Sequence, residues 1–301
     1  MIQKVHESHL GINKCIKLAR SMLFWPYMNH EIKDKVKNCD VCAKFKTRNC
    51  KEPLIPHIIP ELPWEKIGVD IFEYKSKNYL VAKDYYSKWI ECLELKNGKT
   101  SDDVINCLKI MFGHFGIPKI VVSDNIPFNS FQFVTFSKEY NFELVFSSPR
   151  YPQSNGMSES GVKVAKKLLK KSIESKSDFF VAMLNYNNTP VGNLKYSPAQ
   201  LLQGRMMRSK IPVSINLLKP IQVKNAKSEL TKMQMQQKKV YDKTAKLLSE
   251  FSVGDSVLVR FENSWKKGKV VDIHHSPRSY IVEVENKLYR RNRRDLRECY
   301  C

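Results

Sequence analysis

The spacing of apolar and polar positions divides the chain into a helical beginning, a mixed middle and an end of short strands. In KCIKLARSMLFW, apolar residues recur at helical spacing, and the polar segment HEIKDKVKNC predicts a further helix. Residues 47–63 contain four prolines and show little periodicity, which predicts a linker. A helical module at residues 1–46 is therefore separated from the rest of the chain.

From Lys66 onward, short apolar runs alternate with helical patterns. KIGVDIFEY, YLVAKDY and WIECLEL predict three closely spaced strands, and Ser101 is a candidate N-cap of the helix that follows. A strand (KIVVSD), a helix at about 130–140, a strand (FELVF) and a helix at about 157–175 come next, and more helices up to about 204. This order predicts an α/β fold at residues 64–205, in which helices cover a mixed sheet.

The last part of the chain predicts a connecting helix and a small barrel. Residues 224–249 have the pattern of one polar helix within a connecting segment, 206–250. FSVGDSVLVRF, KKGKVVDIHH and SYIVEVENKLYRRN predict short, evenly spaced strands. We therefore expect residues 251–301 to form a small β-barrel with a basic tail.

The charge balance favours a polyanion as partner. The chain has 51 Lys and Arg residues against 30 Asp and Glu residues, a net charge of +21. Binding to phosphates releases condensed counterions, so this excess favours nucleic acid, although a merely basic protein would have the same count. No run approaches the roughly 20 apolar residues that cross a bilayer, and a basic amphipathic segment with bulky apolar anchors is absent. The first residues lack the apolar region of a secretory signal, so we expect a cytosolic or nuclear protein without a membrane partner.

Two histidines and two cysteines have the spacing of a metal site. His6 and His9 open the first helical segment, and Cys39 and Cys42 close the last one. Two imidazoles and two thiolates form a closed tetrahedral Zn²⁺ site, which would clamp a helical unit too small to be stable through its own core. The alternative is that the histidines are exposed and the cysteines are merely buried.

Three carboxylates stand at positions typical of a metal-dependent active site. Asp70 lies inside the first predicted strand, and because Val69 and Ile71 face one side, Asp70 faces the other. Asp124 follows the strand KIVVS, where α/β sheets usually bind ligands, and Glu159 lies in the first turn of the long helix. Such carboxylates bind two Mg²⁺ or Mn²⁺ ions, about 3.5–4 Å apart, for phosphoryl transfer.

Each of these acids, taken alone, would be interpreted as an ordinary solvated or salt-bridged residue. Asp84, Asp102 and Asp103 are the obvious rivals. Asp84 lies on a strand without a metal-site neighbourhood, and the other two have the position of acids in the first turn of a helix. The three predicted ligands therefore stand out only as a set.

Specific motifs occur in all three predicted modules. Along the chain they are HESHLG, WPYM, NCDVC, GVDIFEY, DYYSKWIE, VVSDN, SSPRYPQSNGMSE, YSPAQLLQGR, VGDSVLVR, PRSYIVE and YRRNRRDLR. In this order they resemble the integrase of a gypsy-type LTR retrotransposon, a member of the retroviral-type integrase family. The resemblance implies an RNase H-like core whose triad is formed by the three carboxylates, and a zinc centre formed by the two histidines and two cysteines.

The resemblance also implies an activity and a setting. The family joins DNA in two steps, 3′-end processing of the element's DNA and strand transfer into target DNA. Its partners would be double-stranded DNA, as element ends and as target, and further copies of the chain, because two ends are joined together. We expect a nuclear protein with a cytoplasmic phase, and a piece of a longer pol polyprotein.

Basic residues in two places are candidate DNA contacts. Lys163, Lys166 and Lys170 share a helix face with Glu159, and the resemblance implies that the first two contact the element's DNA end. It also implies that two residues of the preceding loop, Gln153 and Asn155, shape a mobile DNA-binding loop. In the tail, the predicted phosphate contacts are Arg290, Arg291, Arg293 and Arg294. The alternatives are a solvated lysine face and a solubilising basic end.

Two departures from the family pattern lie beside Asp124. Ile126 stands where the family has Gly, and the interval from Asp124 to Glu159 is one residue shorter than usual. If the family's turn is kept, a β-branched residue would strain it, because positive φ suits Gly. Two further hypotheses therefore stay open: a domesticated or decayed copy that binds DNA without catalysis, and an RNase H-type nuclease without strand transfer.

Overall fold

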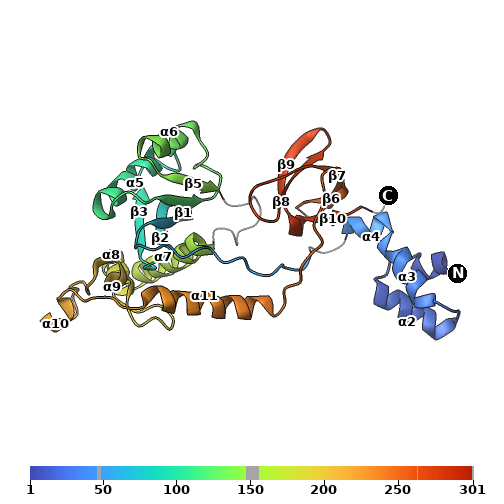
Figure 1. Ribbon diagram of the computed structural model, residues 1–301, viewed down its shortest axis with the longest axis horizontal. Helices are drawn as coiled ribbons and strands as arrows, with labels where there is room; N and C mark the ends of the chain where they lie inside the picture. Colours follow the sequence, from blue (N-terminus) through green and yellow to red (C-terminus); the bar gives the residue numbers. More distant parts are fainter. Residues whose placement is uncertain (46–48, 147–155, 263, 300–301) are drawn as a thin grey trace. The chain divides into compact units, whose positions relative to one another are not determined.

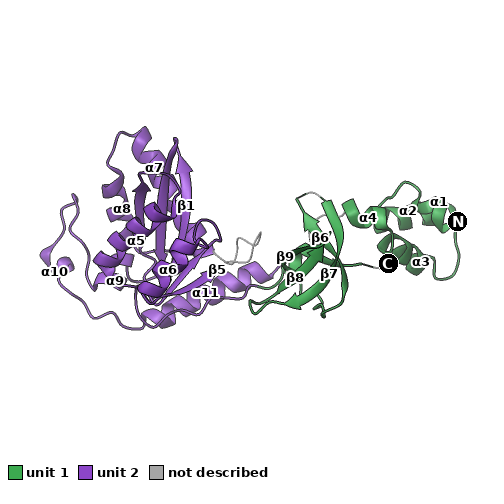
Figure 2. Cartoon of the chain, turned by 90° about the horizontal axis from the view of Figure 1, so that it is seen from above, with its two compact units in different colours: residues 1–53, 244–301 green, residues 54–243 purple. Residues whose placement is uncertain are grey.

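Two compact units make up the part of the chain that the computed structural model describes, residues 1–45, 49–146, 156–262 and 264–299 (Figure 2). One unit combines residues 1–53 with 244–301, and the other comprises residues 54–243. The first contains the predicted helical module and the predicted barrel, and the second contains the predicted α/β core. Within the described ranges, no helix has the length and apolar character needed to span a membrane.

The first 45 residues form four short helices. They are α1 (Ile2–His6), α2 (Ile12–Met22), α3 (Met28–Lys37) and α4 (Asp40–Phe45). Cys15 and Ala19 of α2 pack with Ile32 and Val36 of α3 in a common core, whereas Met22 is 72% exposed. A core this small provides little stability by itself, so a bound metal would contribute directly to folding.

A five-stranded sheet forms the centre of the second unit (Figure 1). Its strands are β1 (Lys66–Tyr74), β2 (Lys77–Asp84), β3 (Ile90–Leu95), β4 (Ile120–Ser123) and β5 (Glu143–Phe146). Their order is β3-β2-β1-β4-β5, with β1 to β3 antiparallel and with β4 and β5 parallel to β1. β1 pairs with β2 from Ile67 to Tyr74 and with β4 from Lys66 to Gly68, so it lies at the centre of the sheet.

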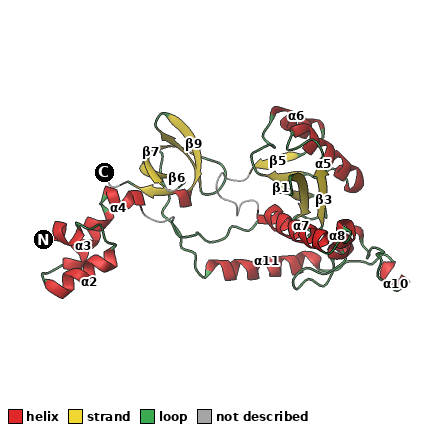
Figure 3. Cartoon of the chain, turned by 180° about the vertical axis from the view of Figure 1, so that it is seen from behind, coloured by secondary structure: helices red, strands yellow, loops and turns green. Residues whose placement is uncertain are grey.

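Helices cover both faces of this sheet (Figure 3). They are α5 (Ser101–Phe115) and α6 (Phe131–Glu139) on one face, and α7 (Gly156–Glu174) and α8 (Phe179–Asn187) on the other. The side chain of Thr100, rather than that of Ser101, caps α5. Ile67 and Val69 of β1 pack in the core beside α5, whereas Phe72 packs beside α7. The predicted mixed α/β fold is confirmed, and it buries β1 on both faces.

Three further helices complete the second unit. They are α9 (Pro198–Gln203), α10 (Ile215–Leu218) and α11 (Ala226–Asp242). α11 is shorter than the helix predicted at 224–249. Lys238 Nζ donates to the carbonyl of Leu54, and Gln234 Nε2 donates to the carbonyl of His57, both at 2.7 Å. Leu54 and His57, which lie in the segment predicted as a linker, are therefore hydrogen-bonded to α11.

The C-terminal part folds into an antiparallel five-stranded sheet of barrel type. Its elements are β6 (Ser256–Phe261), β7 (Ser264–Ile273), β8 (Ser279–Val284), β9 (Lys287–Asn292), the 3-10 helix η2 (Arg293–Asp295) and β10 (Leu296–Glu298). The strand order is β10-β6-β7-β8-β9. Val257, Val259, Val282 and Leu296 are fully buried at its centre. These short, evenly spaced strands agree with the small barrel that the sequence predicts.

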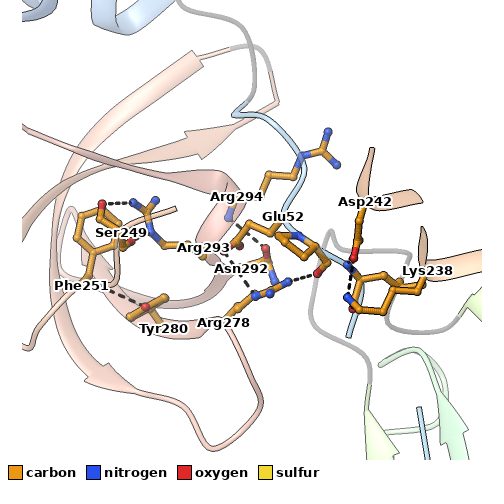
Figure 4. A network of polar contacts seen from close by, with 12 residues as sticks. Glu52, Lys238, Asp242, Ser249, Phe251, Arg278, Tyr280, Asn292, Arg293 and Arg294 are labelled. Carbon is orange, nitrogen blue, oxygen red and sulfur yellow. Dashed lines mark hydrogen bonds and ion pairs between the residues drawn. The ribbon is translucent and has the colours of Figure 1, made fainter. Parts of the chain in front are cut away.

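Residues 49–53 belong to the barrel rather than to a linker. The side chain of Asn49 donates to the carbonyl of Leu296 and accepts from Nε of Arg297, both at 2.7 Å. Arg278 lies 3.5 Å from the carboxylate of Glu52, which is 4% exposed (Figure 4). Residues 49–53, which precede the second unit in the chain, are therefore held on the barrel.

Candidate active site and zinc centre

The two histidines and two cysteines of the helical module converge on one point. Each offers one ligand atom, and the four atoms lie within 4.8 Å of one another. His6 Nε2 is 3.4 Å from Cys42 Sγ, and His9 Nδ1 is 3.4 Å from Cys39 Sγ. One tetrahedral ion would therefore be held by Nε2 of His6, Nδ1 of His9 and two thiolates. Among the described residues, no other set of three or more His, Cys, Asp and Glu side chains forms such a group.

Short helices bring these four residues together. His6 ends α1, and His9 follows with a left-handed φ of 50° and donates its N–H to the carbonyl of His6. Cys39 lies between α3 and α4, and Cys42 lies within α4. Burial, and to a smaller extent the charge of His9, lowers the pKa of His6. The neutral imidazole that results is the form that binds a metal ion.

A fifth side chain, which no spacing in the sequence marks as part of the site, lies behind the zinc centre. Cys15 is fully buried, and its Sγ is 3.7 Å from His6 Nδ1 and donates to the carbonyl of Leu10 at 3.1 Å. Burial raises the pKa of the Cys15 thiol, so it keeps its proton. Contacts on the second ring nitrogen of a metal-binding histidine fix its tautomer and orientation. Helical spacing puts Cys15 on the buried face of α2, but it does not reveal the contact with His6.

Two of the three predicted carboxylates follow the paired parts of β1 and β4. Gly68 pairs with Val122 in parallel register, and Asp70 and Asp124 each come two residues later in the chain. Asp70 is half-buried and lies on the face of β1 opposite Val69, as strand alternation predicts. Asp124 is exposed directly after β4.

The third carboxylate, Glu159, lies in the first turn of α7, which packs very closely on the sheet. A Cβ atom on Gly68 would lie 3.2 Å from the backbone nitrogen of Ser158. A Cβ atom on Gly161 would lie 3.3 Å from Cβ of Lys83. Glu159 lies between Ser158 and Gly161 in the helix. Because Gly68 and Gly161 have no side chains, α7 can pack close to the sheet, and this brings the carboxylate of Glu159 near β1.

The three carboxyl groups interact electrostatically. Burial raises the pKa of Asp70 to about 6, with a hydrogen bond from the N–H of Ile71 opposing the shift and the charges of Asp124 and Glu159 adding to it. Burial also raises the pKa of Glu159, whereas Lys163 lowers it. Neighbouring carboxylates that disfavour each other's ionised form are stabilised by a cation. The three predicted acids thus lie close enough to one another to interact electrostatically.

The predicted lysine row lies on α7 beside these acids. Lys163 and Lys170 are exposed, and Lys166 is half-buried. The ammonium group of Lys166 is 5.9 Å from the ring centre of Phe72, and that of Lys170 is 5.7 Å from the ring centre of Tyr74. Aromatic side chains of β1 therefore support two of the three lysines, on the same strand that carries Asp70.

The loop beside Asp124 does not carry the predicted strain. Ile126 is 81% exposed, and its φ is not among the positive values found in the described chain. The strain expected if the family's turn were kept is therefore absent, because the backbone at Ile126 does not have the positive φ that a β-branched residue tolerates poorly. Gln153 and Asn155, the other predicted loop residues, lie outside the described residues.

The rival acids have structural partners. Asp84 is fully buried at the end of β2 and accepts hydrogen bonds from the N–H and the hydroxyl group of Ser87, at 2.8 and 2.5 Å. Asp103 accepts from the N–H of Asn97 at 2.7 Å and so holds the turn before α5, while Asp102 is exposed in the first turn of that helix. None of these acids influences the pKa of Asp70.

Arginines of the predicted DNA-binding tail lie largely within the barrel. Arg291 and Arg293 are only 6% and 5% exposed, and Arg293 donates to the hydroxyl group of Ser249 (Figure 4). Arg290 and Arg294 also donate to groups of the same unit. DNA contact by these arginines stays a prediction, and the burial of Arg291 and Arg293 argues against it.

Comparison with protein families gives two matches along the chain. Residues 1–48 match the integrase zinc binding domain, and residues 60–152 match the integrase core domain. The chain therefore carries an integrase zinc-binding domain and an integrase core of RNase H-like fold, followed by the small barrel. The predicted zinc module and fold class are confirmed.

Relatives and a solved structure extend this likeness over the whole chain. The Caenorhabditis elegans protein K02A2.6 is 28% identical over 313 residues, which cover 100% of this chain and 24% of that protein. The transposon Tf2-3 polyprotein of Schizosaccharomyces pombe is 27% identical over 288 residues, which cover 86% of this chain and 22% of the polyprotein. A chain of the simian T-cell lymphotropic virus intasome in complex with PP2A regulatory subunit B56 gamma has a TM-score of 0.65 at 17% identity, over 100% of this chain and 99% of that one. At this identity the structural likeness concerns the fold alone, and this chain spans about a quarter of the length of the curated relatives it matches.

Proposed function

We propose that this chain is the integrase of a gypsy-type LTR retrotransposon and that it catalyses 3′-end processing of the element's DNA and strand transfer into target DNA. The observation that carries the proposal is that Asp124, at a strand end, and Glu159, at a helix start, lie close enough to Asp70 on the central strand for their charges to raise its pKa. Carboxyl groups whose pKa values are raised by burial and by one another are typical of a catalytic site. The partial match to transposon polyproteins supports the same conclusion.

The donor set fits two divalent cations. Carboxylate oxygens favour Mg²⁺ or Mn²⁺, and three of them are the ligand set typical of a two-metal site for phosphoryl transfer. Bound there, such ions would activate the attacking oxygen and stabilise the leaving oxygen of a phosphoryl transfer. The chain's own contribution is to hold Asp70 and Glu159 in place, since β1 is paired with β2 at Asp70 and α7 is packed closely on the sheet.

Lys163 is the candidate for holding the DNA strand at this site. It is exposed, lies one helical turn after Glu159, and its charge lowers the pKa of that carboxyl. An ammonium group so placed would neutralise a backbone phosphate next to the reacting one. Lys166 and Lys170 continue the row along α7 and would contact the following phosphates.

The remaining modules would organise the complex. The zinc-binding domain and the barrel provide further surfaces for DNA and for other copies of the chain, because two DNA ends must be joined together. We propose a homo-multimer assembled on double-stranded DNA, which acts in the nucleus after a cytoplasmic phase. The net charge of +21 favours this polyanionic partner.

The test is a joining assay with the full chain. Purified protein is incubated with Mn²⁺ and blunt DNA duplexes ending in the element's terminal sequences, with the Asp70→Asn protein as a matched control. We expect shortened 3′ ends and joined products with the wild-type chain and neither product with Asp70→Asn. DNA binding without either product would favour the second candidate, a domesticated or decayed copy. Cleavage without joining would favour an RNase H-type nuclease.

A further inference from the structure

Lys83 is a buried lysine close to the proposed active site. It lies on β2, opposite Gly68 of β1, and its residue is only 6% exposed. Its Nζ donates to the hydroxyl group of Ser160 in the first part of α7, at 2.8 Å. Ser160 follows Glu159 directly, so a charged side chain from the sheet reaches the helical turn that carries the third carboxylate.

The contact between Lys83 and α7 has three components. The hydroxyl group of Ser160, besides accepting from Lys83, donates to the carbonyl of Met157 at 2.8 Å. The stem of Lys83 packs under Gly161, where a Cβ atom would come within 3.3 Å of Cβ of Lys83. Hydrogen bonds therefore run from β2 through Ser160 to the residue that lies two positions before Glu159. Together they restrict how α7 rotates and slides on the sheet.

A buried lysine at this position lowers the stability of the fold rather than raising it. Burial, and to a smaller extent the charge of Lys88, lowers the pKa of Lys83 to about 8, which means that the ammonium form is disfavoured there. A cation near the N-terminal turn of a helix also opposes the helix dipole. A methionine of similar length would fill the space without these penalties.

Lys88 offers an internal comparison. It is also buried, and burial lowers its pKa to about 8 as well, although the charge of Asp84 opposes the shift. Its Nζ donates to the carbonyl of Tyr85, within the turn between β2 and β3. Lys88 thus stabilises a local turn, whereas the hydrogen bond of Lys83 crosses from the sheet to α7.

We propose that Lys83 is a positioning residue that acts through Ser160 to hold Glu159 at the metal-binding site. The proposal rests on the proposed function of Glu159 as a metal ligand. Lys83 itself is buried and takes no part in binding DNA. Its removal would let the first turn of α7 shift, and a displacement of about 1 Å in a catalytic group can cost on the order of a hundredfold in rate.

The experiment compares Lys83→Met, Ser160→Ala and the double variant with Lys88→Met, all in the full chain. Direct Mn²⁺ binding, the Mn²⁺ concentration for half-maximal joining, the joining rate and DNA affinity are measured. We expect Lys83→Met and Ser160→Ala to weaken Mn²⁺ binding several-fold and to lower the joining rate by about tenfold to a hundredfold, with DNA affinity within about twofold of wild type. The double variant should lose little more than either single one, because both act on one contact.

Lys88→Met should lower thermal stability and leave Mn²⁺ binding unchanged. Equal Mn²⁺ binding and joining in wild type and Lys83→Met would overturn the proposal while the proposed function stands. The same holds if Lys88→Met weakens Mn²⁺ binding as much as Lys83→Met does, because the effect would then come from loss of stability. If Lys83→Met does not fold, Ser160→Ala decides by the same criteria. A wild-type chain that binds no Mn²⁺ at Asp70 and Glu159 contradicts the proposed function, and this proposal with it.

Discussion

The guanidinium carbon of Arg293 lies 4.0 Å from the centre of the Phe251 ring inside the barrel. The same guanidinium donates to the carbonyl of Leu296 at 2.8 Å and to the hydroxyl group of Ser249 at 3.1 Å. An arginine that charge patterning assigned to DNA therefore joins the segment before β6 to β10. Deleting residues 287–301 would remove β9 and β10 together with Arg293. Such a deletion would therefore change the fold of the barrel as well as any DNA contact of the tail.

Replacement of Arg293 should destabilise the barrel. Arg293→Gln removes charged hydrogen bonds from a buried guanidinium, one of them to the buried carbonyl of Leu296, and we expect a loss of about 2–3 kcal/mol in the free energy of unfolding. Urea unfolding of the full chain, followed by fluorescence, measures this loss. The matched control is Arg208→Gln, because Arg208 is exposed. Equal unfolding midpoints for the two variants would contradict the structural role of Arg293.

Exposed lysines on β7 should supply the phosphate contacts of the barrel. Lys269 is exposed on this strand, which also carries the exposed Lys266 and Lys267. We expect Lys269→Gln to reduce the slope of log affinity against log salt by about one, because one fewer phosphate is neutralised. The measurement is DNA binding by fluorescence anisotropy at several salt concentrations. An unchanged slope would remove this face of the barrel from the DNA-binding surface.

Cys15 should strengthen zinc binding without being a ligand. Cys15→Val leaves the four ligands in place but removes the sulfur beside His6 Nδ1, so we expect zinc affinity to fall by about 10–100-fold. Competition with a chromophoric chelator measures this in the full chain. Ile32→Val trims the same small core elsewhere and serves as the control. A similar loss of zinc affinity in both variants would mean that Cys15 acts only through packing.

Asp70 should lower the stability of the metal-free protein at neutral pH. Its folded pKa of about 6 lies above the ordinary 3.8, so its stabilising contribution is complete below about pH 4 and is lost as the pH rises through 6. Asp70→Asn should therefore melt at a higher temperature than wild type at pH 7.5 without metal, and should not join DNA. Added Mn²⁺ should raise the melting temperature of wild type but not of Asp70→Asn. A lower melting temperature of metal-free Asp70→Asn would show that Asp70 is a structural acid.

Asp84, in contrast to Asp70, should be needed for stability through its hydrogen bonds and should not be needed for joining. Asp84→Asn places an NH₂ group or a weaker acceptor against the N–H and hydroxyl donors of Ser87, and we expect a loss of about 1–3 kcal/mol in stability. Joining activity should persist below the lowered melting temperature, since Asp84 does not influence the carboxylate cluster. An inactive but fully folded Asp84→Asn protein would show that this acid belongs to the active site.

Much of the candidate site follows from the sequence because its chemistry requires particular residue types. Imidazoles of His6 and His9 and thiolates of Cys39 and Cys42 are ligands that zinc prefers. Their spacing around helical segments can be recognised in the sequence. The side of the strand on which Asp70 lies follows from the twofold alternation of any β-strand. The order of strands and helices is equally local, because it depends on periodicity over a few residues.

Tertiary structure decided what depends on contacts between residues far apart in the chain. That Lys83 reaches Ser160, that Cys15 lies behind His6 and that Arg293 is buried against Phe251 all depend on strand register and close packing. A charge count cannot distinguish a buried arginine from an exposed one, since both have the same pattern in the sequence. The backbone at Ile126 likewise depends on how its loop fits between β4 and α6, which no single residue type determines. Ligand chemistry and local periodicity are written in the sequence, whereas burial and side-chain partners exist only after the chain has folded.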